Sequence, residues 1–339
     1  MKSFTIFFKA LIILSGITCL GSNVRAQDIL SILQDPVMND SILKEHKIRS
    51  VTVLFEYGNV QNRSLTDRTY FDKIRDAEFD ENGRIVYNYL NHGQKFYSDI
   101  DFCRNGGLQT FEYDSKGQLL KSSSLFRFDV DVEEFEYDGE GNIIGKRTFS
   151  GNELLMKETF DWKNGKMKEG SFEGTHYKTE ELQATYDEKG RMVLLTSERS
   201  ETTTVYEDYE DSVVVTEKTV LSYRENEVAK KVQTISDTRI LSFQLFLNDD
   251  LGADVQVSYD AHGNVTSYRI KSKLNADDPE TAELEELLIE IDNQYDSRGL
   301  LTKRTFYFTG REYTEKRLDR IEWYVYENQP LRIRHSMED

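Results

Sequence analysis

Cysteine and proline are scarce in this chain of 339 residues, which has only two cysteines and three prolines. Cys19 lies in a leading segment that we expect to be removed, so Cys103 alone would remain and no internal disulfide could form. Long apolar runs are also missing, because no stretch after the first 26 residues approaches the ~20 apolar residues of a membrane-spanning helix. We therefore expect a product with no membrane span that is stabilised by packing and strand pairing.

The first 26 residues have the pattern of a secretory signal peptide. Two lysines precede an apolar stretch, 10–20, that is too short to cross a bilayer, and Val24-Arg25-Ala26 is a small-x-small cleavage site. We predict a signal peptide at 1–26 and an exported product in the periplasm, at the cell surface or outside the cell. A lipid anchor would need Cys19, but the preceding Gly16-Ile17-Thr18 fits a lipobox poorly.

An excess of basic residues is missing as well. The formal net charge is −18, and it becomes −21 when residues 1–26 are removed, because they carry three basic residues and no acidic one. A strongly acidic chain does not favour nucleic acid or anionic lipid as a partner. Hydrophobic residues make up 38%, charged residues 31% and aromatic residues 12%, a mixture typical of a sheet with one apolar and one polar face.

One short pattern, aromatic-Asp-x-x-Gly-x-aliphatic, recurs along the chain, as in Tyr137-Asp138-Gly139-Glu140-Gly141-Asn142-Ile143. Six copies keep the aromatic residue, Asp and Gly in place: Phe79, Asp80 and Gly83; Tyr113, Asp114 and Gly117; Tyr137, Asp138 and Gly141; Tyr186, Asp187 and Gly190; Tyr259, Asp260 and Gly263; Tyr295, Asp296 and Gly299. A form shorter by one residue occurs at 162–167. A regular motif of this kind indicates a repeated structural unit.

The motif predicts a β-hairpin. Asp caps a tight turn with its side chain, and Gly takes the positive φ that closes a three-residue loop with a bulge. The loop would place Tyr113 opposite Leu119, with both side chains on one face of the sheet. We therefore predict an all-β fold in which tandem antiparallel hairpins form an extended twisted or spiralling sheet over 49–339, preceded by a short helical or loop segment at 27–48.

At these residues the sequence resembles the YD-repeat proteins, the family of RHS and teneurin-like repeats. In that family the repeats are β-hairpins that coil into a long spiralling sheet, and they mark no catalytic residues. This chain is far shorter than the large members, and it looks more like the small exported YD-repeat proteins of Gram-negative bacteria. The resemblance implies a structural role for the repeats and no settled activity.

Catalytic and metal motifs are missing. None of the five histidines lies in an H-E-x-x-H or a close His/Cys/Asp cluster, and the sequence contains no G-x-S-x-G elbow or P-loop. Asp129, Asp131 and Glu133 alternate along one strand and could bind calcium through oxygen ligands. The alternative is a solvated strand face opposite Val130 and Val132.

Aromatic residues near the C-terminus suggest a second candidate site. Side chains alternate along residues 323–326. Either Trp323 with Val325 or Tyr324 with Tyr326 therefore faces outward if the sheet has a single core side. Exposed Trp and Tyr on a sheet can bind carbohydrate or protein. The alternative is that these rings cover an edge or pack beneath a terminal loop.

These observations favour a non-enzymatic, exported scaffold or recognition protein of the cell envelope, with no cofactor. Its partner would be a glycan or an envelope protein. One alternative is an envelope glycan hydrolase with a carboxylate pair on the concave sheet face. Another is a calcium-stabilised adhesin-like module. The sequence leaves the ligand and the oligomeric state open.

Overall fold

The computed structural model describes residues 40–57, 73–91, 106–126, 129–175, 177–221, 227–237, 239–272, 285–310 and 313–330. The predicted signal peptide at 1–26, Cys19, Cys103 and the first part of the 27–48 segment lie outside these ranges. The predicted domain boundaries therefore stay predictions.

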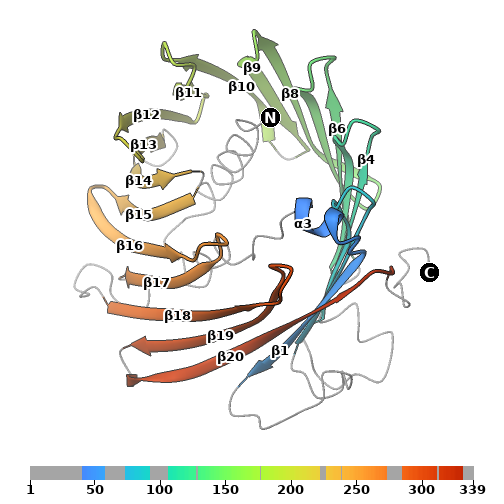
Figure 1. Cartoon of the computed structure of the whole chain (residues 1–339). Coiled ribbons are helices and arrows are strands. Elements are labelled where there is room, and N and C mark those ends of the chain that lie inside the picture. Colours follow the sequence, from blue (N-terminus) through green and yellow to red (C-terminus); the bar gives the residue numbers. More distant parts are fainter. Residues whose placement is uncertain are drawn as a thin grey trace. The chain divides into compact units, whose positions relative to one another are not determined.

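Twenty strands and one short helix make up the described chain (Figure 1). The helix is α3 (Asp40–Glu45). The first ten strands are β1 (Ser50–Tyr57), β2 (Lys73–Phe79), β3 (Ile85–Asn91), β4 (Gly106–Tyr113), β5 (Leu119–Phe126), β6 (Asp129–Tyr137), β7 (Ile143–Ser150), β8 (Glu153–Lys163), β9 (Lys166–Gly174) and β10 (Tyr177–Tyr186). The other ten are β11 (Met192–Thr196), β12 (Ser200–Asp208), β13 (Val213–Leu221), β14 (Glu227–Ser236), β15 (Arg239–Leu247), β16 (Asp250–Tyr259), β17 (Val265–Ser272), β18 (Glu285–Tyr295), β19 (Leu301–Gly310) and β20 (Tyr313–Glu327).

All twenty strands belong to one sheet, and every pairing whose register is described is antiparallel. β1 pairs with β2 on one side and with β20 on the other. The β1–β20 pairing runs from Ser50 opposite Glu327 to Tyr57 opposite Arg320, which is the whole length of β1. The first and last strands of the chain are therefore neighbours.

The predicted open, twisted or spiralling sheet is wrong. In such a sheet β1 would be an edge strand with unpaired backbone groups, whereas here β20 occupies that edge. The twenty strands form a closed antiparallel sheet, and closure removes the exposed edges that invite aggregation. The hairpin motif reports only on neighbouring strands, so it could not indicate that strands from opposite ends of the chain meet.

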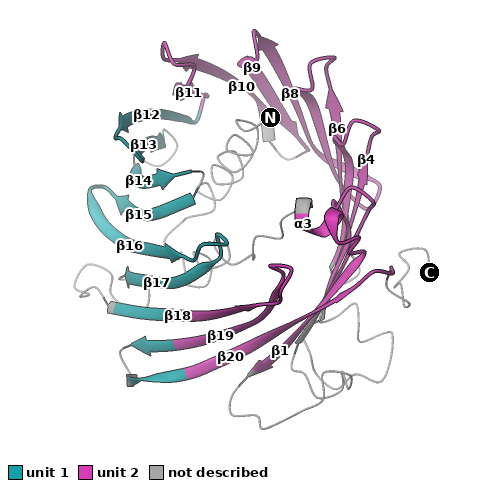
Figure 2. Cartoon of the chain, in the orientation of Figure 1, with its two compact units in different colours: residues 1–37, 199–290, 308–317 teal, residues 38–198, 291–307, 318–339 magenta. Residues whose placement is uncertain are grey.

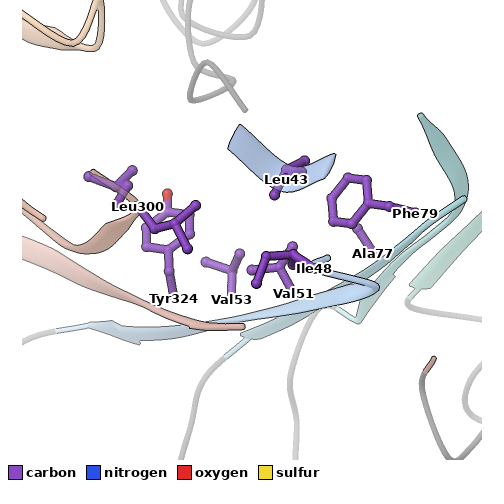
Figure 3. Close-up of a cluster of buried hydrophobic side chains, with 9 residues drawn as sticks. Leu43, Ile48, Val51, Val53, Ala77, Phe79, Leu300 and Tyr324 are labelled. Carbon is purple, nitrogen blue, oxygen red and sulfur yellow. The ribbon is translucent and has the colours of Figure 1, made fainter. Parts of the chain in front are cut away.

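The helix α3 and the short segment that follows it cover one face of β1 and its neighbours. Leu43 of α3 and Ile48 are each only 1% exposed, and they pack on Val51 and Val53 (Figure 3). The same cluster of buried side chains also includes Ala77, Phe79, Leu300, Leu301 and Tyr324. We call the sheet face that carries Val51 and Val53 the core face.

By its contacts the chain divides into two compact units, coloured in Figure 2. The second unit comprises 38–198, 291–307 and 318–339, and it contains β1–β11 together with parts of the last three strands. Within this unit the strand register can be followed from β1 to β10, so each residue can be assigned to the core face or to the opposite face. The candidate site described below lies entirely in this unit.

Among the residues described, no helix is long and apolar enough to cross a membrane. The broader prediction that the chain makes no membrane span is nevertheless wrong. It was drawn from helical runs alone, whereas strands of a closed sheet also satisfy their backbone groups without water. The β1–β20 pairing supplies that closure.

Candidate functional site

The motif turns are built by their Asp and Gly residues. Asp138 Oδ1 accepts hydrogen bonds from the backbone N–H groups of Glu140 and Asn142, both at 2.9 Å. Gly141 has a φ of 92°, a left-handed conformation that favours glycine. The other motif glycines, Gly83, Gly117, Gly190, Gly263 and Gly299, also have positive φ.

The turns also set the cross-strand pairs. Tyr137 lies opposite Ile143, with a register shift beside it that marks the bulge. The same relation holds for Phe79 and Ile85, Tyr113 and Leu119, Tyr186 and Met192, Tyr259 and Val265, and for Trp162 and Met167 in the short form. At the Tyr295 turn, the Asp296 N–H donates to the Leu300 carbonyl at 2.9 Å.

Four of the aromatic residues at these turns also tie their hairpin to the preceding one. The Tyr137 hydroxyl donates to the Leu119 carbonyl at 2.8 Å, and the Tyr113 hydroxyl donates to the Ile85 carbonyl at 3.0 Å. The Trp162 Nε1 group donates to the Ile143 carbonyl at 2.6 Å, and the Tyr259 hydroxyl to the Ile240 carbonyl at 2.9 Å. The motif residues therefore hold consecutive hairpins together, which is a structural role.

The aromatic platform proposed from the sequence is largely internal. Tyr324 is only 6% exposed and its hydroxyl donates to Glu322 at 2.8 Å. Tyr326 packs against the core cluster. Trp323 lies on the opposite face, half-buried, with its Nε1 group 3.5 Å from Glu56 Oε2. Tyr324 and Tyr326 thus cannot serve as an exposed surface, because the sheet places them on its core face.

The Tyr324 hydroxyl belongs to a buried ion cluster between β19 and β20. Glu322 Oε1 accepts from Arg320 Nε at 2.9 Å, and Glu322 Oε2 lies 3.6 Å from Arg304 Nη1. The Arg304 side chain is 2% exposed, and burial raises the pKa of Tyr324 well above its usual value. The cluster links Arg304 of β19 to Glu322 of β20, so it helps to hold the two strands together.

The calcium hypothesis concerns Asp129, Asp131 and Glu133 on β6. The Asp131 side chain is exposed, that of Asp129 lies outside the described residues, and Glu133 Oε1 forms an ion pair with Lys146 Nζ at 2.6 Å. No group of three or more His, Cys, Asp or Glu side chains that could hold a metal ion occurs in the described part of the chain. Glu133 is instead part of a different arrangement.

A row of side chains crosses the core face of five consecutive strands. Register pairing joins Phe135 on β6 to Lys146 on β7, Lys146 to Glu158 on β8, Glu158 to Phe172 on β9, and Phe172 to Glu180 on β10. We call Phe135, Lys146, Glu158, Phe172 and Glu180 the core-face row. Glu133 and Thr148 are also register partners. They lie two residues from Phe135 and Lys146, respectively, and so on the same face.

The central contacts of the row are ionic. Lys146 Nζ lies 2.6 Å from Glu133 Oε1 and 3.6 Å from Glu158 Oε2, and the Lys146 side chain is 22% exposed. Glu133 Oε2 also accepts from the Ser122 hydroxyl at 3.2 Å. The ammonium group therefore bridges two carboxylates that reach it from different strands.

Burial shapes the protonation of this network. It raises the pKa of Glu158, and the attraction of Lys146 offsets this effect only in part. Burial alone would lower the pKa of Lys146, but the combined hydrogen bonding and attraction of Glu133 and Glu158 outweigh it, and the pKa is raised. Lys146 therefore stays charged, while Glu158 takes up a proton more readily than an exposed glutamate does.

At its other end the row terminates in a deeply buried acid. Glu180 is 4% exposed, and its Oε1 accepts from the Ser197 hydroxyl at 2.9 Å. Phe172 is the register partner of both Glu158 and Glu180, so one ring lies between two carboxylates. An arrangement of rings alternating with charges can bind a ligand that has apolar faces and hydrogen-bond donors.

Sequence reasoning did not identify Lys146, Glu158 or Glu180. The signal was their spacing, because Glu158 is separated by even steps from Phe160 and Trp162 and must share their face. The same rule places Glu133 with Phe135 and Tyr137, on the core face rather than on a solvated face. Charged residues at core positions break the binary pattern, and such breaks mark functional or strained sites.

Comparisons with known proteins give no family for this chain. No family model matches it, and no curated protein matches it. Among solved structures, a porin-like protein from Bacteroides uniformis has 9% identity and a TM-score of 0.32, over 83% of this chain and 96% of that chain. A porin-like protein from Bacteroides vulgatus has 10% identity and a TM-score of 0.30, over 66% of this chain and 95% of that chain.

The predicted membership of the YD-repeat family is wrong. No model of such a family matches the chain, and its hairpins are consecutive strands of a closed sheet rather than repeats of an extended one. The motif arises from the requirements of the turn, which unrelated hairpins share.

Proposed function

We propose that the chain is an exported, non-enzymatic protein of the bacterial cell envelope that binds a glycan on the core-face row. The observation that carries the proposal is the placement of Lys146, Glu158 and Glu180 on the core face, in register with Phe135 and Phe172. Sheet stability alone favours apolar residues there, because charged groups are costly to bury.

A sugar ring fits this alternation of side chains. Its C–H faces pack on aromatic rings, while its hydroxyl groups donate to carboxylates. Phe172 offers such a ring between Glu158 and Glu180, and both carboxylates accept hydrogen bonds. The partly exposed Lys146 can donate to a ring or hydroxyl oxygen of the ligand.

The test is a screen of the mature chain on a glycan array, followed by calorimetric titration of the best ligand. Because a hydrogen bond to a charged group contributes about 1.5–3 kcal/mol, the substitution Glu158→Gln should weaken binding by roughly 10- to 100-fold. The matched control is Glu173→Gln, which removes the same charge from an exposed side chain on the opposite face of β9. Equal loss in both variants, or no glycan bound at all, would contradict the proposal.

A second candidate is a glycan hydrolase, and one observation favours it. Glu158 has a raised pKa, as a general acid requires, and Glu133 lies across the same Lys146. Against it, the Lys146 ammonium occupies the space between the carboxylates where a substrate bond would have to lie. Release of reducing ends from the array hits, abolished by Glu158→Gln, would establish hydrolysis in place of simple binding.

A further inference from the structure

Two buried acceptor atoms beside the core-face row have no hydrogen-bond partner. They are Glu158 Oε2 and Thr148 Oγ1, and both are sealed from solvent. The nearest charge to Glu158 Oε2 is Lys146 Nζ at 3.6 Å, which is beyond hydrogen-bond distance. Buried polar atoms are nearly always paired, so each unpaired one calls for an explanation.

The two atoms belong to adjacent strands and to the same face. Thr148 pairs with Met156 on β8 and Lys146 pairs with Glu158, so Thr148 and Glu158 are diagonal neighbours across the β7–β8 pair. Diagonal side chains of this kind lie within about 8 Å of each other. A single donor group with several hydrogens can therefore reach both atoms.

The charge around this pair is negative. Among the described side chains of the row and its neighbours on the same face, three carboxylates, Glu133, Glu158 and Glu180, accompany one ammonium, that of Lys146. Lys146 directs its short contact to Glu133 and lies 3.6 Å from Glu158 Oε2, so Glu158 has an ion pair but no short hydrogen bond from the ammonium group. A ligand that brings a positive charge would offset the excess, whereas a neutral hydroxyl would only donate a hydrogen bond.

We propose that the glycan bound by the core-face row carries a free protonated amine, which donates to Glu158 Oε2 and Thr148 Oγ1. An ammonium group has three donor hydrogens and so can serve both atoms at once. Met156 on one side and Phe172 on the other provide apolar surface for the sugar ring. The inference rests on the proposed function, because it specifies the chemistry of the ligand at the same site.

The experiment compares two probes of equal length, a hexamer of β-1,4-linked glucosamine and its fully N-acetylated counterpart. They differ in the charge of the amine and share the same sugar backbone. Each is titrated into the mature chain at a mildly acidic pH, where the glucosamine amines are protonated, and at about 0.15 M salt, where long-range attraction to an acidic surface is screened. The free-amine hexamer should bind at least about 10-fold more tightly, as expected for one charge-assisted hydrogen bond.

Two variants locate the amine. Glu158→Gln should reduce the preference for the free-amine hexamer to nearly 1-fold, and Thr148→Val, which keeps the shape and removes the hydroxyl, should reduce it by roughly 3- to 10-fold. Glu173→Gln removes an equal charge from the opposite face and should leave the preference unchanged. Thr148→Val is mild enough to remain folded, so the test stands even if Glu158→Gln unfolds.

The outcomes separate the two proposals. If both hexamers bind equally well, or if the preference survives in both row variants, the assignment of the amine is overturned while glycan binding stands. If neither these hexamers nor any glycan on the array binds, the proposed function fails, and the amine assignment fails with it. A preference lost in Glu158→Gln and Thr148→Val but kept in Glu173→Gln supports both.

Discussion

Lys146 and Arg147 are adjacent in the sequence and lie on opposite faces of β7, which makes them a sharp test of the core-face row. The Lys146 side chain is 22% exposed and bridges Glu133 and Glu158. The Arg147 side chain is 43% exposed and pairs with Glu134 and Glu136 on the opposite face. We predict that Lys146→Met destabilises the protein far more than Arg147→Met.

The magnitude follows from burial. Removing one partner of a fully buried ion pair costs about 3–5 kcal/mol, because the other charge is left uncompensated. Lys146 retains some solvent access, so we expect about 2–3 kcal/mol for Lys146→Met, whereas exposed pairs such as those of Arg147 contribute less than about 1 kcal/mol. The assay is equilibrium unfolding of the mature chain in urea, compared at equal slope.

A second substitution sharpens the comparison. Adding Glu158→Leu to Lys146→Met removes an uncompensated carboxylate and places an apolar side chain beside Phe172, so part of the lost stability should return. The reasoning would be refuted if Lys146→Met proved neutral or if Arg147→Met cost as much. It would also be refuted if the loss of stability in the double variant equalled the sum of the losses in the two single variants.

Four further predictions concern the turns and the charges. Gly141→Ala should lower the free energy of unfolding by about 1–2 kcal/mol, because the φ of Gly141 is 92°. Gly139→Ala in the same turn, with open space around it, should lower it by less than about 0.5 kcal/mol. Thermal unfolding measures both losses, and equal losses would contradict the turn geometry. Tyr137→Phe removes the hydrogen bond to the Leu119 carbonyl and should cost about 1 kcal/mol in urea unfolding, while Tyr209→Phe, at an exposed turn, should cost nothing measurable. Hydrogen bonds from the Asn142 side chain and backbone lower the pKa of Asp138. The stability that this carboxylate contributes is therefore present above its unfolded pKa of about 4 and is lost as the pH falls further. Acid unfolding of Asp138→Asn should show a weaker pH dependence than that of the parent, and an unchanged curve would count against the cap. Chelation with EDTA should leave the melting temperature unchanged, because Glu133 is held by Lys146; a fall in melting temperature would revive the calcium hypothesis.

The turns were predictable from the sequence because their physics is local. An Asp cap and a Gly with positive φ fall within seven residues, and they determine that Tyr137 meets Ile143. The ties between hairpins, such as Tyr137 to the Leu119 carbonyl, were not foreseen. They depend on how one hairpin sits against the next, which the motif does not encode.

The closure of the sheet could not be predicted in this way. β1 and β20 come from opposite ends of the chain, and no local pattern states that Val53 will lie opposite Tyr324. The burial of Tyr324 and Tyr326 could not be predicted for a related reason, because they pack in one cluster with Leu43 and Ile48 from the other end of the chain. Long-range pairing depends on the whole set of strands and not on any one segment.

The core-face row could be predicted only in part. Its face could be read from the spacing of Glu158, Phe160 and Trp162, but its partners required the register of five strands. An abundance of Asp and Glu in the sequence concealed the few that lie at core positions. The register pairing of adjacent strands is needed to show that Lys146, Glu158 and Glu180 lie in one row across the sheet.

The most direct test of the account is a crystal structure of the mature chain with the glucosamine hexamer bound. The account predicts density for a sugar on the core face of β7–β9, with its amine within hydrogen-bond distance of Glu158 Oε2 and Thr148 Oγ1 and its ring against Phe172. Sugar density on the opposite face or elsewhere on the protein, with Glu158 and Thr148 unchanged, would contradict it.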